Sequence, residues 1–331
     1  MVEFVHPGTM FLKSEIPEML KRTKTNPKSA SAYANLEKAT PHTYIPKPHA
    51  HMTINWGRWD PATARVHTEL MADGQQSYQQ ALMYVLTNDQ TYAKNALAIV
   101  NAWSTVNVSA DGTNMPLEFA WCQPSFARAM ELLKYTYPHY VTEGVPVEKA
   151  YMKWLDEVVM PLLTKRISWT NNWLITMCAA RMQIAILRND HTEFQNTIAA
   201  FKSYVPDLIE TCGLPVEVKR DLTHTQFTLG SLAMVCQMAW NQGVDLYSYS
   251  NNIVFKAFEM TAAILLGEKP PATKGIDLKT LSMKPAFWDT VIYHYVEVKK
   301  LCMPNATKLL SEKRPEFILW CWGLSTLTHY H

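Results

Sequence analysis

Two adjacent asparagines, Asn171 and Asn172, stand immediately before Trp173 and a largely apolar run that ends at Leu187. The run predicts a helix, and the first turn of a helix leaves backbone N–H groups without partners inside it. Two amides beside those N–H groups could hold a carboxylate. A purely structural role is the alternative, because Asn171 or Thr170 would also serve as the N-cap of that helix.

A second polar cluster, Lys219 to Gln226, precedes the apolar residues of another predicted helix that extends to Trp240. Arg220 and His224 are four residues apart and would share a helical face. Arginine can bind a carboxylate through two parallel hydrogen bonds, and a neutral histidine can accept a proton near neutral pH. The cluster alone does not distinguish a binding site from a helix cap.

A third segment, Tyr293-His294-Tyr295, lies on a late predicted helix. Tyr293 and Tyr295 would point in different directions there, so at most one of them could meet His224. Aromatic side chains at helical spacing most often fill the core. Tryptophans elsewhere could instead stack on sugar rings. Those are Trp56, Trp59 and Trp121.

Helical periodicity extends almost throughout the sequence, and helices must therefore position these groups. From Gln76 to Leu86 apolar residues recur at helical spacing, and a second such run begins at Asp89 and reaches Trp103. The two residues between the runs allow only a tight turn, which predicts an antiparallel hairpin. Further helices are expected near 117–135, 148–164, 172–187, 191–210, 226–241, 244–266 and 286–299.

The expected fold class is all-α, in a single domain over residues 1–331. Alternating runs typical of strands are scarce, and 11 glycines in 331 residues is a low content. Antiparallel helix pairs can either stack as a solenoid or close into a double ring. Since no solenoid repeat signature is found, we predict the closed ring, an (α/α) toroid.

Composition restricts the possible functions. Hydrophobic residues make up 48% of the chain and charged residues 18%, which is typical of a folded globular protein. The net charge is +2 without clustered Lys and Arg, so we expect no nucleic-acid partner. No apolar run reaches the roughly 18 residues of a membrane span. The six cysteines include no C-x-x-C pair, which argues against a zinc site and leaves disulfides open.

Taken together, these segments resemble the alginate-lyase-like polysaccharide lyases, and most closely the branch that includes glucuronan lyases. The resemblance covers nearly the whole chain and depends on the order and spacing of many short pieces. They include His6-Pro7-Gly8, Gln80-Ala81-Leu82, Asn101-Ala102-Trp103, Phe126-Ala127-Arg128-Ala129, Asn171-Asn172-Trp173, Arg220-Asp221 with His224 and Gln226, Trp240-Asn241-Gln242-Gly243, His294-Tyr295, Arg314-Pro315 and Thr326-Leu327-Thr328-His329.

The resemblance implies an incomplete (α/α) toroid with a groove across one end, and cleavage of a β-1,4-linked uronic acid polymer by β-elimination without metal or other cofactor. It implies that Asn171 or Asn172 neutralises the substrate carboxylate. It assigns the active-site Arg, His and Tyr to Arg220, His224 and Tyr295. We expect further substrate contacts from Trp173, Gln226 and His294 and from the tryptophans at 56, 59 and 121.

One departure from the family pattern bears on the substrate. In alginate lyases proper a histidine directly follows the asparagine pair, whereas Trp173 stands here. By the same resemblance, alginate lyases proper carry a tyrosine near the position that His224 occupies in this chain. Glucuronan is therefore the first expected substrate, with alginate or mannuronan next.

The chemistry of β-elimination suits these residue types. The C5 proton of a uronate is hard to remove because the adjacent carboxylate is already negative. Amide and guanidinium donors favour the enolate-like transition state, by ~3–4 kcal/mol per donor in other enzymes. A base must take the C5 proton and an acid must protonate the departing O4. His224 and Tyr295 could share these roles in either order, or one tyrosine could perform both.

Two other classes of function remain open. An inverting glycoside hydrolase on a similar ring would need two carboxyl groups roughly 6.5–9.5 Å apart. Its possible carboxyl groups are Glu118, Glu217, Asp221 and Asp289. A non-catalytic glycan-binding module would depend on the tryptophans alone. The lyase interpretation predicts a secreted monomer whose partner is an anionic polysaccharide, with no nucleic acid and no membrane.

Overall fold

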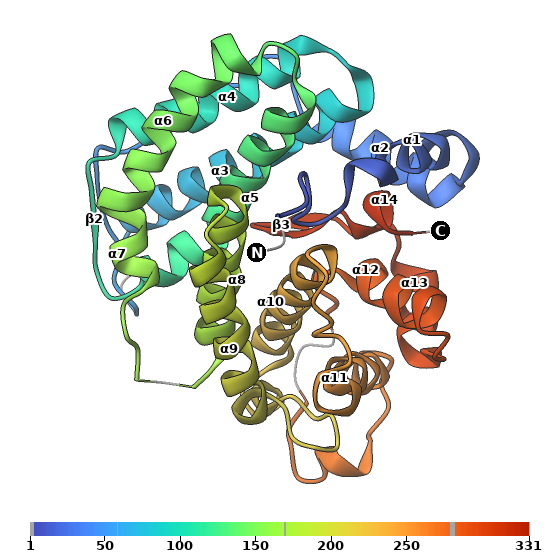
Figure 1. Cartoon of the computed structure of the whole chain (residues 1–331). Coiled ribbons are helices and arrows are strands. Elements are labelled where there is room, and N and C mark those ends of the chain that lie inside the picture. The colour runs from blue at the N-terminus through green and yellow to red at the C-terminus, as the bar shows by residue number, and fades with distance from the viewer. Residues whose placement is uncertain (1–2, 58, 169, 279–281, 331) are drawn as a thin grey trace.

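Helices make up most of the computed structural model, which describes residues 3–57, 59–168, 170–278 and 282–330 (Figure 1). The helices are α1 Ile16–Thr25, α2 Pro27–Ala39, α3 Pro61–Thr87, α4 Gln90–Val106, α5 Met115–Thr136, α6 Val145–Trp154, α7 Met160–Leu163, α8 Asn172–Arg188, α9 His191–Leu208, α10 Leu222–Asn241, α11 Tyr249–Leu265, α12 Trp288–Ile292, α13 Pro304–Lys313 and α14 Ser325–Thr328. Strand β1 (His51–Thr53) pairs in parallel with β2 (Ser109–Asp111), and β3 (Ile318–Leu319) pairs antiparallel with β4 (Trp322–Gly323).

The long helices α3, α5, α8 and α10 pack side by side in this order and run in one direction. Contacts between neighbouring helices establish that direction. His67 lies 2.7 Å from Glu118 near the starts of α3 and α5, and the rings of Tyr84 and Tyr137 are 5.2 Å apart near their ends. The His6 ring bonds both Glu131 late in α5 and Asn189 at the end of α8. Asn172 at the start of α8 lies beside Glu217, just before α10. The N-terminal ends of these helices therefore gather at one end of the molecule.

Tight turns send the chain back along the outside after α3 and α8. Each of these helices ends at an asparagine in the left-handed conformation, Asn88 with φ 60° and Asn189 with φ 56°, a usual way to end a helix. Asp89 and Asp190 then cap α4 and α9 by accepting a backbone N–H of the first turn. In Figure 1 the returning helices α4, α6 and α7 lie outside α3 and α5. The predicted hairpins are thus confirmed.

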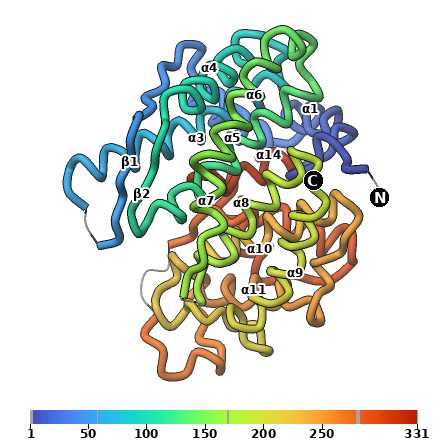
Figure 2. The backbone as a smooth tube through the Cα atoms, turned by 60° about the vertical axis from the view of Figure 1, so that its left-hand side comes forward, coloured from blue at the N-terminus to red at the C-terminus, as the bar shows by residue number. Residues whose placement is uncertain are grey.

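The ring is closed by contacts between the two ends of the chain. Helix α12 packs against α10 and α14, and α14 packs against α1 and α2. The buried Arg22 side chain of α1 donates to the Thr328 carbonyl at 2.8 Å. Figure 2 shows α14 lying beside the N-terminal helices. This arrangement confirms the predicted all-α fold and its incomplete (α/α) toroid, which the short helices α12 and α14 help to close.

Several helices differ from their predicted limits. Helix α3 begins at Pro61, well before residue 76; its first turns are exposed or half-buried and carry few large apolar residues, so the apolar period is weak there. Helix α10 begins at Leu222, capped by Asp221, instead of near residue 226. The late helix expected near 286–299 is short, and a π-helical turn over Tyr293–Val298 follows it. Each cysteine is a free thiol.

Buried charge holds the C-terminal part of the ring together. The Glu316 carboxylate accepts hydrogen bonds from the Ala286 N–H at 2.7 Å and from the Ser325 hydroxyl. Beside it Asp289 and Arg314 form a buried ion pair at 2.7 Å. Burial raises the pKa of Glu316 to about 7 even though these hydrogen bonds oppose the rise, and the nearby Asp289 charge raises it further. Glu316 is therefore partly protonated near neutral pH.

This pKa predicts a stability that depends on pH. Because the folded protein binds the Glu316 proton more tightly than the unfolded chain, the stabilisation is present below pH 4.5 and is lost as the pH rises through about 7. The free energy of unfolding of the unmodified protein should fall by up to about 3 kcal/mol between about pH 5 and about pH 8 because of Glu316. In Glu316→Gln this fall should be absent. Glu312→Gln, on the exposed side of α13, is the control. An equal pH dependence in both variants would contradict the assignment.

Candidate active site

Asn171 caps α8 and lines a cavity at its N-terminal end. Its side-chain Oδ1 accepts the Trp173 backbone N–H at 3.1 Å, which leaves the amide NH₂ for another partner. The cavity has a volume of about 430 Å³, and its other walls are Trp56, Trp173 and Arg220. Asn171 is therefore both a helix cap and a cavity residue.

Asn172 has a different environment from its neighbour. It is buried, and its backbone N–H and side-chain amide lie 3.3 and 3.5 Å from Oε1 of Glu217, on the short 3₁₀ turn Val216–Lys219. The structure thus turns Asn172 toward Glu217 and Asn171 toward the cavity. Neither assignment could be made from the sequence, where the two asparagines are equivalent.

Arg220 brings positive charge to the cavity. Its guanidinium lies 3.8 Å from a Glu217 oxygen and 3.9 Å from an Asp221 oxygen, and its side chain is about half exposed. Both distances exceed those of a hydrogen bond. The guanidinium N–H groups can therefore still donate to an anionic ligand.

His224 is held by the residue that caps its own helix. Asp221 accepts the His224 backbone N–H at 2.7 Å through one oxygen and contacts the ring Nδ1 at 2.7 Å through the other. Partial burial opposes ionisation of Asp221, but these hydrogen bonds and the Arg220 charge outweigh it, and the pKa of Asp221 lies below its ordinary value. An ionised Asp221 favours a proton on Nδ1 and leaves Nε2 as the acceptor.

An aromatic platform formed by Trp121, Phe227 and Trp320 lies beside His224. The rings of Trp121 and Trp320 stack at 4.0 Å, and Phe227 lies 5.0 Å from Trp320. The His224 ring meets Phe227 at 5.6 Å. Trp320, between β3 and β4, was missed by the sequence reasoning because nothing local connects it to residues a hundred positions earlier.

His67, which the sequence reasoning also missed, contacts two rings of the platform. Its ring lies 6.0 Å from Trp320 and 6.4 Å from Trp121, and Trp59 meets it edge-on at 5.1 Å. The expected tryptophans are therefore distributed along one region, with Trp56 in the cavity, Trp59 against His67 and Trp121 in the platform.

Tyr295 does not join this group, and its expected catalytic role has to be corrected. It is completely buried, and its hydroxyl donates to the Tyr247 carbonyl at 2.8 Å and accepts the Phe255 N–H at 3.2 Å. Burial raises the pKa of Tyr295 well above its usual range. The hydroxyl therefore has structural partners and no open side toward a ligand.

His294 lies in the same distant cluster as Tyr295. It is buried, stacks on Tyr247 at 3.7 Å and meets Trp240 edge-on at 4.6 Å. Trp240 is near the C-terminal end of α10, about 24 Å along the helix axis from His224. Burial, with the nearby Lys299 charge, lowers the pKa of His294 to about 4. The expected contact of His294 with a substrate at His224 is therefore not made.

Gln226 also has a structural role instead of the expected substrate contact. Its side-chain amide donates to the Ser282 carbonyl at 3.0 Å and accepts the Lys284 N–H at 2.6 Å. The side chain is completely buried and ties the segment before α12 to α10. Residues two apart on a helix face different sides, so Gln226 cannot accompany His224.

The carboxyl groups considered for a hydrolase are all engaged. Glu118 and Asp221 each hold a histidine, Glu217 lies against Asn172, and Asp289 pairs with Arg314. Within the described ranges no three His, Cys, Asp or Glu side chains lie close enough to hold a metal ion. None of the helices in those ranges is both long and apolar enough to cross a membrane.

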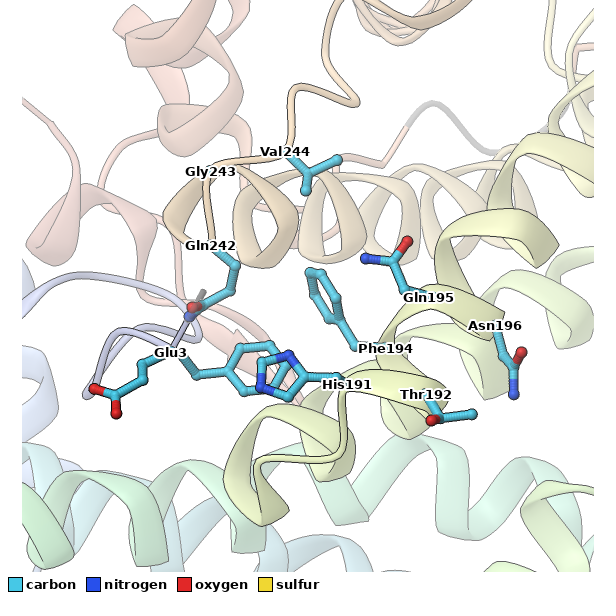
Figure 3. Close-up of a pocket in the computed structure, with 10 residues that line it drawn as sticks. Glu3, His191, Thr192, Phe194, Gln195, Asn196, Gln242, Gly243 and Val244 are labelled. Atoms are coloured by element: carbon cyan, nitrogen blue, oxygen red, sulfur yellow. The ribbon is translucent and has the colours of Figure 1, made fainter. Parts of the chain in front are cut away.

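A cavity of about 690 Å³ lies elsewhere, beside the start of α9. Figure 3 shows the rings of His191 and Phe194 and the amides of Gln195 and Gln242 around it. Among the described residues that line it, none is expected to act in catalysis, and Glu3 alone is an acidic or basic residue other than histidine. A polyanion would gain nothing from that environment, so the smaller cavity at Asn171 is the better candidate site.

Comparison with known proteins identifies relatives of this fold. A family model described as alginate lyase matches residues 15–270. An alginate lyase structure from Bacteroides ovatus is 12% identical with a TM-score of 0.69, over 98% of this chain and 99% of that one. A histidine variant of alginate lyase A1-III complexed with a tetrasaccharide is 18% identical with a TM-score of 0.72, over 96% and 94%. No curated protein sequence matches the chain.

The corrected position of Tyr295 gives a prediction about stability. Tyr295→Phe should lower the free energy of unfolding by about 1–3 kcal/mol, because a buried carbonyl and an N–H group lose their partner. Turnover should stay near that of the unmodified protein. Denaturant titration and kinetics on the same sample would test this. Tyr249→Phe, whose hydroxyl bonds the Lys202 carbonyl at the surface, is the control and should cost less. A large loss of turnover with unchanged stability would return Tyr295 to the active site.

Proposed function

Since this chain belongs to the alginate lyase family and is a polysaccharide lyase acting on uronic acid polymers, we propose that the cavity at Asn171 is its catalytic site and that glucuronan is its preferred substrate. The observation that carries the proposal is that polar residues from separate segments come together in space. Asn171 and Arg220 stand at two separate helix starts, yet both line one cavity with Trp56 and Trp173, and Asp221 lies between Arg220 and the ring of His224. Residues that only cap two separate helices would not be expected to line the same cavity.

The carboxylate of the substrate would be bound by Asn171 and Arg220. The free amide of Asn171 and the guanidinium of Arg220 are neutral and positive donors that meet the same cavity. The N-terminal ends of α8 and α10 add the positive ends of their helix dipoles. Neutralised in this way, the carboxylate can accept the charge that develops when the adjacent C5–H bond breaks.

His224 would act as the base. Its Nε2 takes the C5 proton, the electron pair of that bond forms the C4=C5 double bond, and the C4–O4 bond breaks with its electron pair leaving on O4. Asp221 fixes the ring and stabilises the imidazolium that forms, as a carboxylate does for a catalytic histidine in other enzymes. The products are a 4,5-unsaturated uronate and a chain that ends at the released O4.

Trp56 and Trp173 suit the sugar rings of such a substrate. Trp56 is 73% exposed, which is unusual for so large an apolar side chain unless it meets a ligand. Aromatic faces stack on the apolar faces of pyranose rings. By resemblance, alginate lyases proper carry a histidine at the position of Trp173. This difference favours glucuronan over mannuronan as the substrate.

Other features of the proposal follow from the substrate. Polyuronates are large anions that do not cross membranes, so we expect the enzyme to be secreted. Residues 1–331 would act as one catalytic domain and as a monomer. Asn171 and Arg220 already supply the charge neutralisation that a metal would otherwise provide, so we expect metal-independent elimination.

The proposed roles predict the behaviour of substituted enzymes. His224→Ala and Asn171→Ala should each reduce kcat on glucuronan about 10²–10⁴-fold, because each removes a group needed in the transition state. The ultraviolet absorbance of the unsaturated product measures the rate. Asn172→Ala should cost less activity, since its side chain faces Glu217. His42→Ala, which breaks an exposed His–Asp pair on the outer surface, is the matched control. Absence of the unsaturated product from every uronan tested would refute the proposed function.

Metal independence is tested separately. The purified enzyme should keep its rate on glucuronan after dialysis against EDTA, because Asn171 and Arg220 bind the carboxylate directly. Loss of activity on chelation, with recovery on adding back a divalent ion, would contradict this part of the mechanism.

A further inference from the structure

The structure contains a second histidine held by a carboxylate beside the aromatic platform. Nδ1 of His67 lies 2.7 Å from Oε2 of Glu118. Glu118 is completely buried, and its other oxygen accepts the side-chain amide of Asn114 at 2.7 Å. Both carboxylate oxygens are thus fixed, and the ring of His67 can take only a narrow range of orientations.

The ring of His67 contacts the platform and has one nitrogen without a hydrogen bond among the described residues. With Nδ1 bonded to Glu118, the ring carries Nε2 on its opposite edge, and the described residues offer that nitrogen no hydrogen bond. The side chain is 19% exposed. Its ring has edge contacts with Trp59, Trp121 and Trp320 at 5.1 to 6.4 Å. His224 contacts the same platform through Phe227.

Other histidine–carboxylate pairs in the chain lack this combination. His6 has both ring nitrogens bonded, to Glu131 and to Asn189. His49 pairs with Glu69 at 2.7 Å, but the aromatic ring near it is Trp103, in the packing between α3 and α4. Only in His67 and His224, among the described residues, does a carboxylate-held ring with an unbonded Nε2 border the platform.

We propose that His67 is the second proton-transfer residue of this lyase, the acid that protonates the departing O4, and that Glu118 is its positioning residue. This inference rests on the proposed function. In glucuronan the C5 proton and O4 leave from the same face of the sugar ring, so the base and the acid must both reach that face. His224 and His67 border one aromatic platform, which is the arrangement that such a pair needs. The structure thereby supplies the acid that Tyr295 cannot provide.

The proposed step balances in atoms and electrons. The imidazolium of His67 gives its Nε2 proton to O4 as the C4–O4 bond breaks, while His224 takes the C5 proton. One histidine begins protonated and ends neutral, and the other changes in the opposite sense. A proton exchange with water between turnovers restores both.

An acid and a base can be told apart by the leaving group. His67→Gln should reduce kcat on glucuronan about 10²–10⁴-fold. On a synthetic uronate whose O4 carries a nitrophenyl group, a leaving group that needs no acid, the same variant should stay within about tenfold of the unmodified enzyme. His224→Gln should be slow on both substrates. Glu118→Gln should show the His67→Gln pattern with a smaller loss. His49→Gln is the matched control and should change neither rate.

A second variant covers the chance that His67→Gln disturbs the fold. In His67→Ala, added imidazole should restore part of the rate on glucuronan, which a purely structural role would not allow. Full activity of His67→Gln on glucuronan, or an equal loss on both substrates, or no rescue of a folded His67→Ala by imidazole, would overturn the assignment of His67. If the unmodified enzyme fails on all uronans and on the nitrophenyl substrate, the proposed function itself has failed.

Discussion

The packing of α3, α5, α8 and α10 in a single direction determines where functional groups can lie in this protein. Because each helix is followed by a return along the outside, the N-terminal ends share one end of the ring. That end collects unpaired backbone N–H groups and the positive ends of helix dipoles. A polyanionic substrate is favoured there before any side chain is considered, and Asn171, Arg220 and His224 occur in the first turn of these helices or just before it.

The helix caps show how one residue can serve structure and chemistry together. Asn171 and Asp221 each accept a backbone N–H at the start of a long helix. Each also has a second polar group, an amide in one case and a carboxylate oxygen in the other, that extends beyond the cap. The alternatives of cap and site residue are therefore compatible, because capping uses only part of the side chain.

The sequence was informative about groups whose position depends on local structure. Hairpins at Asn88 and Asn189 follow from tight turns between apolar periods, and the fold class follows from many such pairs. Arg220 and His224 were predicted to share a helical face; in the structure Arg220 lies before the helix begins, and Asp221 links the two side chains. The same reasoning could not distinguish Asn171 from Asn172, because a cap and its neighbour differ only in which way the chain enters the helix.

Groups brought together by ring closure could not be predicted in this way. Tyr295 has a plausible type and lies one residue from a histidine, yet the π-helical turn after α12 directs it into the core between Tyr247 and Phe255. Trp320 enters the platform from a short hairpin that has no helical period. These positions depend on contacts between distant parts of the chain.

The platform has a consequence for the synthesis of the protein. Trp320 stacks on Trp121, and the segment that carries it is held in the ring by α14, which packs on α1 and α2 and accepts the Arg22 hydrogen bond. Domains generally begin to fold from the N-terminal side as they are made. Here the N-terminal helices can pack early, but Trp121 gains the Trp320 ring only after residues 318–328 have left the ribosome. The platform that His67 and His224 contact would therefore be completed only late in synthesis.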